Sequence, residues 1–178
     1  MKKIVVCLLF IVSCLLSPQL VLADYVLPYP SYMPGNKLYT VTRIIDGLKR
    51  FWYFGNIAQV KYHLGLSDKY LVEAKTLMEY NQYLLGADAL TRSDRQFTQL
   101  PPYLIGAKNE RADIAVLKQT VQDAAAKHTE ILKQLQAAVP VQFTWTPEKS
   151  ASTALNLGSM IQSSRALRTS VASDAAGL

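Results

Sequence analysis

Apolar residues recur every three or four positions through most of this chain, and that spacing predicts helices. The clearest run covers residues 110–138, where spacings of three and four alternate without a break. Its seam positions are Ile114, Leu117, Val121, Ala124, His128, Ile131, Leu135 and Ala138. A seam of this kind predicts a long helix that packs inside a bundle and ends at Pro140.

Two further helices are predicted before this one. The first covers residues 36–54, with Asn36 as its N-cap and Gly55 as its stop. It carries one apolar face, made of Leu38, Val41, Ile45, Leu48 and Trp52. The second covers residues 56–80 and has an apolar arc of about 200°, wider than that of an ordinary surface helix. We therefore expect it to be central, with a polar face made of Lys61, Asp68, Lys69, Lys75 and Glu79.

The remaining segments are less regular. A helix that begins at Asn81 should be kinked or restarted at Pro101-Pro102. Residues 141–147 alternate apolar and polar between two prolines, which predicts an extended strap. Residues 148–178 contain 13 Ser and Ala among 31 residues, so we expect a weak last helix with a frayed end. Residues 25–34 contain three prolines and three tyrosines, which favours extended backbone.

The predicted fold is therefore all-α: an antiparallel bundle of four to five helices with an extended Pro/Tyr-rich N-terminal strap. We divide the chain into a signal peptide at 1–23, a helical bundle domain at 24–147 and a Ser/Ala-rich C-terminal helix and tail at 148–178. The 178 residues are 50% hydrophobic and 18% charged, which allows one real core and excludes disorder throughout.

Residues 1–23 have the pattern of an export signal. Lys2 and Lys3 precede a charge-free apolar stretch, and Ala23 stands at the expected cut. Two alternatives remain open. Residues 4–23 are long enough to span a bilayer if they are retained, and Cys14 loosely fits a lipid-attachment site. Each option makes the domain extracytoplasmic, either secreted or associated with the cell envelope.

Both cysteines, Cys7 and Cys14, lie in this first segment. A chain cut after Ala23 therefore has no disulfide, thiolate nucleophile or cysteine metal ligand. The loss of Lys2 and Lys3 lowers the formal net charge from +6 to +4. That charge favours mild attraction to anionic surfaces and does not indicate nucleic acid. We expect an envelope protein or a membrane surface as partner; the oligomeric state stays open.

No combination of residues in the sequence indicates catalysis. His63 and His128 fall in apolar arcs, and neither has the neighbouring ligands that a zinc site needs. We interpret both as buried, with pH sensing by His128 as an open alternative. Glu73 is interpreted as a boundary charge near Lys69. Since the chain also lacks a serine-nucleophile motif and a phosphate-binding loop, we expect no enzyme activity, no cofactor and no metal.

Aromatic residues are the best candidates for an interaction surface. Four of them follow one another at 51–54, beside Lys49 and Arg50, and they cannot all face one core. The full candidate set is Tyr29, Tyr32, Phe51, Trp52, Tyr53, Phe54, Tyr62 and Tyr70. Ordinary packing is the alternative for each of them, because tyrosine fills amphipathic cores well.

Two segments resemble a known family. Residues 27–39 read LPYPSYMPGNKLY, and residues 67–74 read SDKYLVEA. They are similar to the Pro-Tyr segment and to the Ala-Glu-rich helix of a bacterial domain-of-unknown-function family, number 5667, over residues 25–138. The family has Gly, Pro, Glu and Arg where this chain has Ser31, Lys37, Gln59 and Tyr70. The resemblance implies an exported, extracytoplasmic helical domain and supplies no catalytic residues.

These observations together predict an exported, non-catalytic domain that works by interaction with a protein or with the envelope. One alternative is a bundle that binds a lipid, a peptide or a small apolar molecule along Tyr62, Leu66, Tyr70 and Tyr80. An enzyme of unknown class is the remaining alternative.

Overall fold

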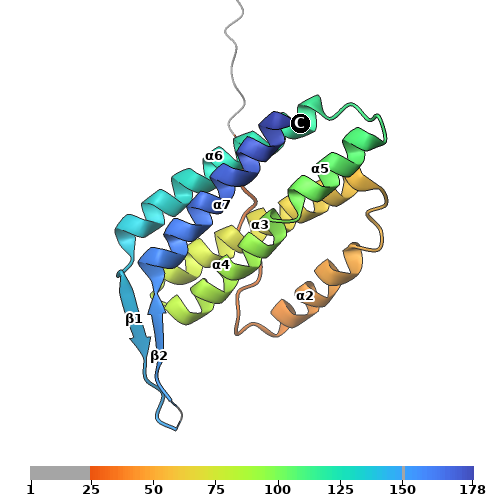
Figure 1. The fold of residues 1–178 in the computed structure, drawn as a ribbon. Coiled ribbons are helices and arrows are strands. Elements are labelled where there is room, and N and C mark those ends of the chain that lie inside the picture. The colour runs from red at the N-terminus through yellow and green to blue at the C-terminus, as the bar shows by residue number, and fades with distance from the viewer. Residues whose placement is uncertain (1–24, 150) are drawn as a thin grey trace, which may run out of the picture.

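The computed structural model describes residues 25–149 and 151–178, and Figure 1 shows their arrangement as a helical bundle. The helices are α2 (Lys37–Lys49), α3 (Asn56–Glu79), α4 (Tyr83–Phe97), α5 (Leu100–Asn109), α6 (Ala115–Ala138) and α7 (Leu157–Gly177). Two short strands, β1 (Gln142–Trp145) and β2 (Thr153–Asn156), lie between α6 and α7. The predicted all-α bundle is confirmed, with this small sheet added to it. The predicted signal at 1–23 lies outside the described residues.

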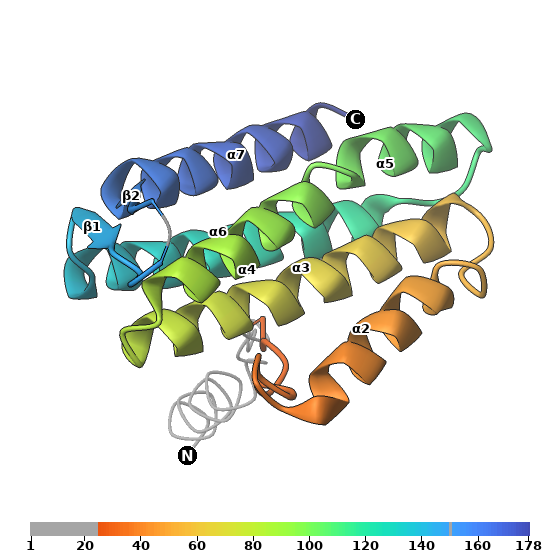
Figure 2. The same ribbon diagram turned by 90° about the horizontal axis from the view of Figure 1, so that it is seen from below.

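The bundle consists of two antiparallel helix pairs, α3 with α4 and α6 with α7, packed face to face (Figure 2). Two clusters of buried side chains fill the space between the pairs. One contains Leu71, Leu90, Leu132 and Ile161; the other contains Val60, Phe97, Leu104 and Val121. Helix α3 contributes to both clusters, as expected for a central helix. Helix α2 lies on the outer side of α3, away from α6 and α7.

The proline pair lies at the start of a helix. One helix, kinked or restarted at Pro101-Pro102, is predicted here, but the break comes earlier. Helix α4 ends at Phe97, and both prolines occupy the first turn of α5. That turn tolerates proline because its N–H groups have no partner inside the helix. The chain therefore restarts ahead of the prolines.

The C-terminal third differs most from expectation. The extended backbone predicted over residues 141–147 is present, and it is paired as one strand of a hairpin, in which Phe143 lies opposite Leu155. The prediction of a weak last helix with a frayed end is wrong. Helix α7 runs to Gly177 and buries Leu157 and Ile161 in one cluster and Val171 and Ala175 in the other.

Residues 25–33 form neither helix nor strand. Leu27 and Met33 pack, partly buried, against the first core cluster. The Tyr25 hydroxyl donates a hydrogen bond to Oδ2 of Asp68 at 2.7 Å. Among the described residues, no helix combines the length and the apolar content that crossing a bilayer requires.

Candidate functional site

Helix α2 exposes its apolar side to solvent. Five side chains make up this surface, the α2 face: Leu38, Val41, Ile44, Ile45 and Leu48, each between 46 and 59% exposed. At 100° per residue they share an arc of about 120°. The predicted helix and its apolar stripe are therefore present, but within residues 25–149 and 151–178 no other element covers the stripe.

The polar side of α2 faces the bundle instead. Asp46, the one buried residue of this helix, lies on the opposite side from Leu48. Its carboxylate accepts hydrogen bonds from Nζ of Lys69 on α3 and, at 3.2 Å, from Nζ of Lys49. Its backbone carbonyl accepts the Tyr62 hydroxyl at 2.8 Å. Helix α2 is thus attached to α3 through charges and hydrogen bonds.

A second polar contact holds the start of α2. The Tyr39 hydroxyl donates to Oε1 of Glu73 at 2.7 Å and accepts from Nη1 of Arg92 at 2.9 Å. Arg92 on α4 also donates to Glu73 at 3.2 Å. Burial and the Glu73 carboxylate raise the pKa of Tyr39, so the hydroxyl keeps its proton. The interpretation of Glu73 as a boundary charge is wrong: it is 3% exposed and pairs with Arg92.

The four aromatics after α2 extend the exposed apolar surface. Phe51, Trp52 and Phe54 are 71 to 82% exposed, whereas the Tyr53 ring packs 5.3 Å from that of Tyr62. The Gln59 side chain donates to the carbonyls of Arg50 and Tyr53, which holds the turn closed. Residues 51–54, the aromatic segment, therefore project from one end of the α2 face.

The predicted interaction residues fall into two groups. Tyr29 and Tyr32 are exposed, together with the aromatic segment. Tyr62 and Tyr70 are buried and form a small cluster with Leu66. The Arg92 guanidinium lies over the Tyr70 ring, 5.3 Å from its centroid. Tyr80, which the alternative of a ligand-binding bundle includes, is exposed at the far end of α3.

A cavity of about 340 Å³ opens between α2, α3 and residues 28–31. Its walls carry four charged side chains, namely Asp46, Lys49, Lys61 and Lys69. Tyr62 and Leu66, two of the residues predicted to line a ligand pocket, also border it; Tyr70 and Tyr80 do not. The structure thus brings one half of the predicted stripe to a cavity.

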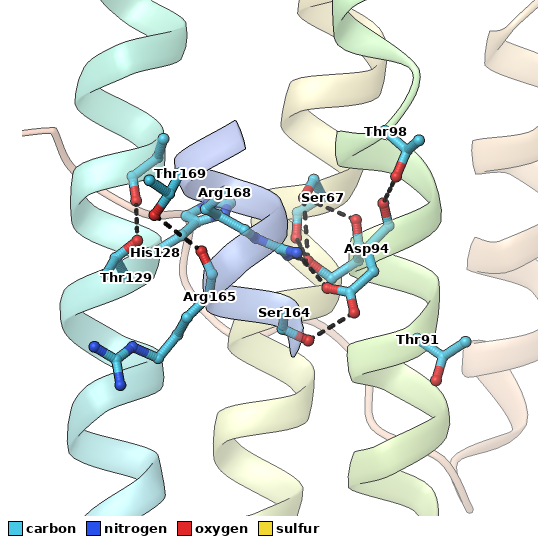
Figure 3. A network of polar contacts seen from close by, with 12 residues as sticks. Ser67, Thr91, Asp94, Thr98, His128, Thr129, Ser164, Arg165, Arg168 and Thr169 are labelled. Carbon is cyan, nitrogen blue, oxygen red and sulfur yellow. Dashed lines mark hydrogen bonds and ion pairs between the residues drawn. The ribbon is translucent and has the colours of Figure 1, made fainter. Parts of the chain in front are cut away.

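A separate polar network lies inside the bundle (Figure 3). Arg168 on α7 pairs with Asp94 on α4, and Ser164 donates to Asp94 at 2.6 Å. Nη2 of Arg168 donates to Oγ of Ser93 at 2.8 Å, and Ser93 in turn donates to the Ser67 carbonyl at 2.8 Å. These hydrogen bonds connect three helices, so the network joins α3, α4 and α7.

His128 is fully buried, as predicted, and its partner is Asp68. Nε2 of His128 lies 2.8 Å from Oδ1 of Asp68. Asp68, expected on the polar face of its helix, is buried and also binds the Tyr25 hydroxyl. That expectation is wrong because the residues that enclose Asp68 come from distant parts of the chain.

His63 is also buried, as predicted. Its Nδ1 lies 2.7 Å from Oε1 of Gln96, and its ring stacks on Tyr103 with centroids 5.2 Å apart. Burial lowers the pKa of His63, while the Gln96 contact acts in the opposite direction. Within residues 25–149 and 151–178, no three His, Cys, Asp or Glu side chains come together as a metal-binding group.

Sequence reasoning missed the side of α2 that faces the bundle, although one signal points to it. Tyr39 and Asp46 are seven residues apart and share the side of α2 away from the apolar stripe, and Tyr53 follows at the same spacing beyond the end of the helix. All three contact α3. A polar residue flanked by two tyrosines at this spacing indicates the attached side.

In a comparison with protein families, the model described as Domain of unknown function (DUF5667) matches residues 31–142. This is the family that the two sequence segments resemble, so that prediction is confirmed. The matched span runs from the segment before α2 through α6 to the first residue of β1. Comparisons with curated proteins and with solved structures gave no match.

Proposed function

Because this chain belongs to the DUF5667 family, whose description assigns no activity, we propose a function from the geometry of its own residues. The protein is an exported, non-catalytic domain that associates with the cell envelope. It does so by binding an anionic membrane surface through the α2 face and the aromatic segment.

The main support for this proposal is that α2 contacts the bundle with its polar side and exposes its apolar side. An amphipathic helix on a globular domain normally buries its apolar side. Here the buried side holds Asp46 and Tyr39, and five aliphatic side chains face solvent. A continuous apolar surface of this kind marks a place where another molecule or a membrane binds. Covering it removes apolar area from water, which is favourable by about 25 cal/mol per Å².

The composition of this surface favours a membrane over a protein partner. Helices that lie in a bilayer interface combine Leu, Phe and Trp on one side with Lys and Arg on the other. The α2 face is followed by Phe51, Trp52 and Phe54, and Lys49 borders it, while Arg43 and Arg50 are exposed on the other side of the helix. Such aromatic side chains insert at headgroup level, where Trp is especially common.

Positive charge is also concentrated in the N-terminal part of the described chain. Residues 25–69 hold six Lys and Arg against two Asp, whereas residues 70–178 hold eleven against ten. The net positive charge of the domain therefore lies in and around α2. It complements anionic lipids, and an export signal at residues 1–23 would bring the domain to the envelope.

Tryptophan fluorescence tests the proposal directly. The chain has two tryptophans, Trp52 and Trp145, so the Trp145→Phe variant leaves Trp52 as the reporter. We expect its emission to shift to the blue with vesicles of phosphatidylcholine and phosphatidylglycerol. Pure phosphatidylcholine vesicles and added salt should weaken the effect, because ions screen the basic side chains.

A matched pair of substitutions distinguishes binding through the α2 face from nonspecific adsorption through any exposed apolar residue. Leu48→Asp should lower vesicle affinity about tenfold or more, because it removes apolar burial and places a carboxylate at the interface. Val116→Asp changes an even more exposed apolar residue, 80% accessible on α6, and should have no effect. The proposal is overturned if the anionic vesicles leave Trp52 unchanged at low salt, or if both variants bind equally well.

A further inference from the structure

The cavity between α2 and α3 borders the α2 face. Thr42 and Lys49 line it from α2. At 100° per residue, these two positions come directly beside Leu38 and Ile45. A bilayer in contact with the α2 face would therefore meet one rim of the cavity at headgroup level.

The cavity has an excess of positive charge. Lys49 and Lys69 share the single carboxylate of Asp46. Lys61, which is exposed on α3, has no ion-pair partner in the part of the chain that the structure describes. The other lining residues are uncharged, so three ammonium groups face one carboxylate. The cavity therefore has two positive charges in excess, and a bound anion would reduce this excess.

The uncharged residues that line the cavity include several with hydroxyl groups, which favours a polyol ligand over a flat apolar ring. Ser31, Thr42, Tyr53 and Tyr62 also line the space. The Thr42 hydroxyl donates to the Leu38 carbonyl and the Tyr62 hydroxyl to the Asp46 carbonyl, so both oxygens can still accept a hydrogen bond from a polyol. Gly65 adds no side chain, and a Cβ atom built there meets no heavy atom within 4 Å. The wall at Gly65 is therefore open to a ligand of a few heavy atoms, while Leu66 adds an apolar contact.

We propose that this cavity binds the phosphodiester headgroup of an anionic glycerolipid, with Lys49, Lys61 and Lys69 around the phosphate. This inference rests on the proposed function and adds a lipid class to it. The phosphate lies near Lys61, the glycerol hydroxyls contact Thr42 and the tyrosines, and the acyl chains leave along Leu38 and Ile45. The cavity has two positive charges in excess, and one phosphodiester lowers this excess to one. A carboxylate-bearing peptide would also need room for its backbone.

A short-chain lipid tests the cavity without a membrane. Dihexanoyl-phosphatidylglycerol stays monomeric below its micelle concentration, so general attraction to a charged surface is absent. We expect it to shift the amide resonances of Tyr62, Gly65 and Lys69 in the ¹⁵N-labelled chain recovered from an exporting host. Inorganic phosphate at the same concentration should not compete, because it lacks the glycerol and acyl contacts.

Three variants sharpen this test. Lys61→Gln should weaken the short-chain lipid about fivefold, the effect of one basic residue on an anionic lipid. Lys133→Gln alters an exposed lysine on α6 and should have no effect. Gly65→Leu fills the cavity and should abolish binding, yet it should not lower the melting temperature, because leucine favours a helix more than glycine does.

The outcomes separate the two proposals. If Lys61→Gln and Gly65→Leu bind the short-chain lipid as the unmodified chain does, the cavity inference is wrong, while vesicle binding through the α2 face still stands. If inorganic phosphate displaces the lipid, the cavity is a general anion site and the inference is wrong in its ligand. If short-chain lipid binds but vesicles do not, the cavity inference holds and the membrane proposal fails.

Discussion

Arg168 is a fully buried cation on the last helix of the chain. It pairs with Asp94, donates to Ser93, and lies over the Phe97 ring, 4.9 Å from the ring centroid. Burial lowers the pKa of Arg168, and the Asp94 carboxylate opposes that effect. A buried charge of this kind costs stability by itself and is tolerated because its partners are in place.

Removing this cation should therefore be costly. We expect Arg168→Met to lower the free energy of unfolding by about 3 kcal/mol, because Asp94 and Ser93 lose their partner. Urea unfolding followed by circular dichroism measures the loss. Arg95→Met is the matched control, since Arg95 neighbours Asp94 in sequence but is exposed. Equal stability of the two variants would contradict the structural role of Arg168.

His128 makes folding sensitive to acid. Burial lowers its pKa from 6.5; the Asp68 hydrogen bond and the Asp94 charge oppose this, and the Arg168 charge adds to it. The Tyr25 hydroxyl also faces Asp68 from the N-terminal segment. The folded state therefore holds His128 neutral, with Nε2 donating to the Asp68 carboxylate. The unfolded state takes up a proton near pH 6.5 and the folded state only at lower pH.

The sign of the pH effect follows from that difference. We expect the contribution of His128 to stability to be complete above pH 6.5 and to be lost as the pH falls below it. His63 acts in the same direction. Chemical unfolding at about pH 7.5, 6 and 5 covers the histidine range. It should show a weaker pH dependence in His128→Gln than in the unmodified chain. Identical pH profiles for the unmodified chain and His128→Gln would remove the sensing role.

At the scale of elements, α2 is the least integrated helix. Asp46 is its one buried residue, and its links to the bundle are polar: Lys69, Tyr62 and the Tyr39–Glu73 contact. A helix with few buried apolar contacts opens locally at a low free energy, without unfolding of the core. Such local opening is compatible with the proposed contact of α2 with a membrane.

Hydrogen exchange should detect this local opening. Amides of α2 should exchange faster than those of α3, and Asp46→Asn should speed α2 about tenfold further by weakening its bonds to two lysines. Exchange in α4 serves as the internal reference and should not change. Protection of α2 equal to that of α3 would show that the helix is held more firmly than its contacts indicate.

At the scale of the whole molecule, α7 completes the bundle. It runs beside α6, and its side chains enter both core clusters. It also provides Arg168 and Ser164, which bind Asp94 on α4. The family match ends at residue 142, before this helix begins. The matched span alone therefore leaves one side of both clusters uncovered.

Deletion of α7 tests how far the bundle depends on it. A chain that ends at residue 147 should lose cooperative thermal unfolding, since Leu132, Val121 and Asp94 would lose their cover. A chain that begins at Tyr25 and keeps α7 is the control and should melt cooperatively. A sharp transition in the shortened chain, recorded by circular dichroism, would show that residues 25–147 fold alone.

Part of the candidate site could be predicted from local sequence. The apolar stripe of α2 and the aromatics at 51–54 were both visible as patterns, because helix spacing depends on neighbours three and four residues apart. Their exposure was not visible, since a stripe has the same spacing whether it packs on α3 or faces solvent. The cavity could not be predicted either, because its lysines come from two helices, and Lys49 and Lys69 come together only through their shared partner Asp46.

The sequence by itself determined the helical class, the central position of α3, the burial of both histidines and the family. These follow from periodicity, from composition and from the Pro-Tyr segment, all of which are local. Only the tertiary structure decided the pairing of β1 with β2 and the burial of Asp68 and Glu73. It also decided the packing of α7 against both core clusters and the exposure of the apolar side of α2. Each of these depends on a partner far along the chain: Asp68 binds a residue 60 positions away, and Arg168 binds one 74 positions away. Ion pairs and hydrogen bonds between residues this far apart leave no periodic pattern in the sequence. Which polar groups are buried is therefore visible only in the folded structure.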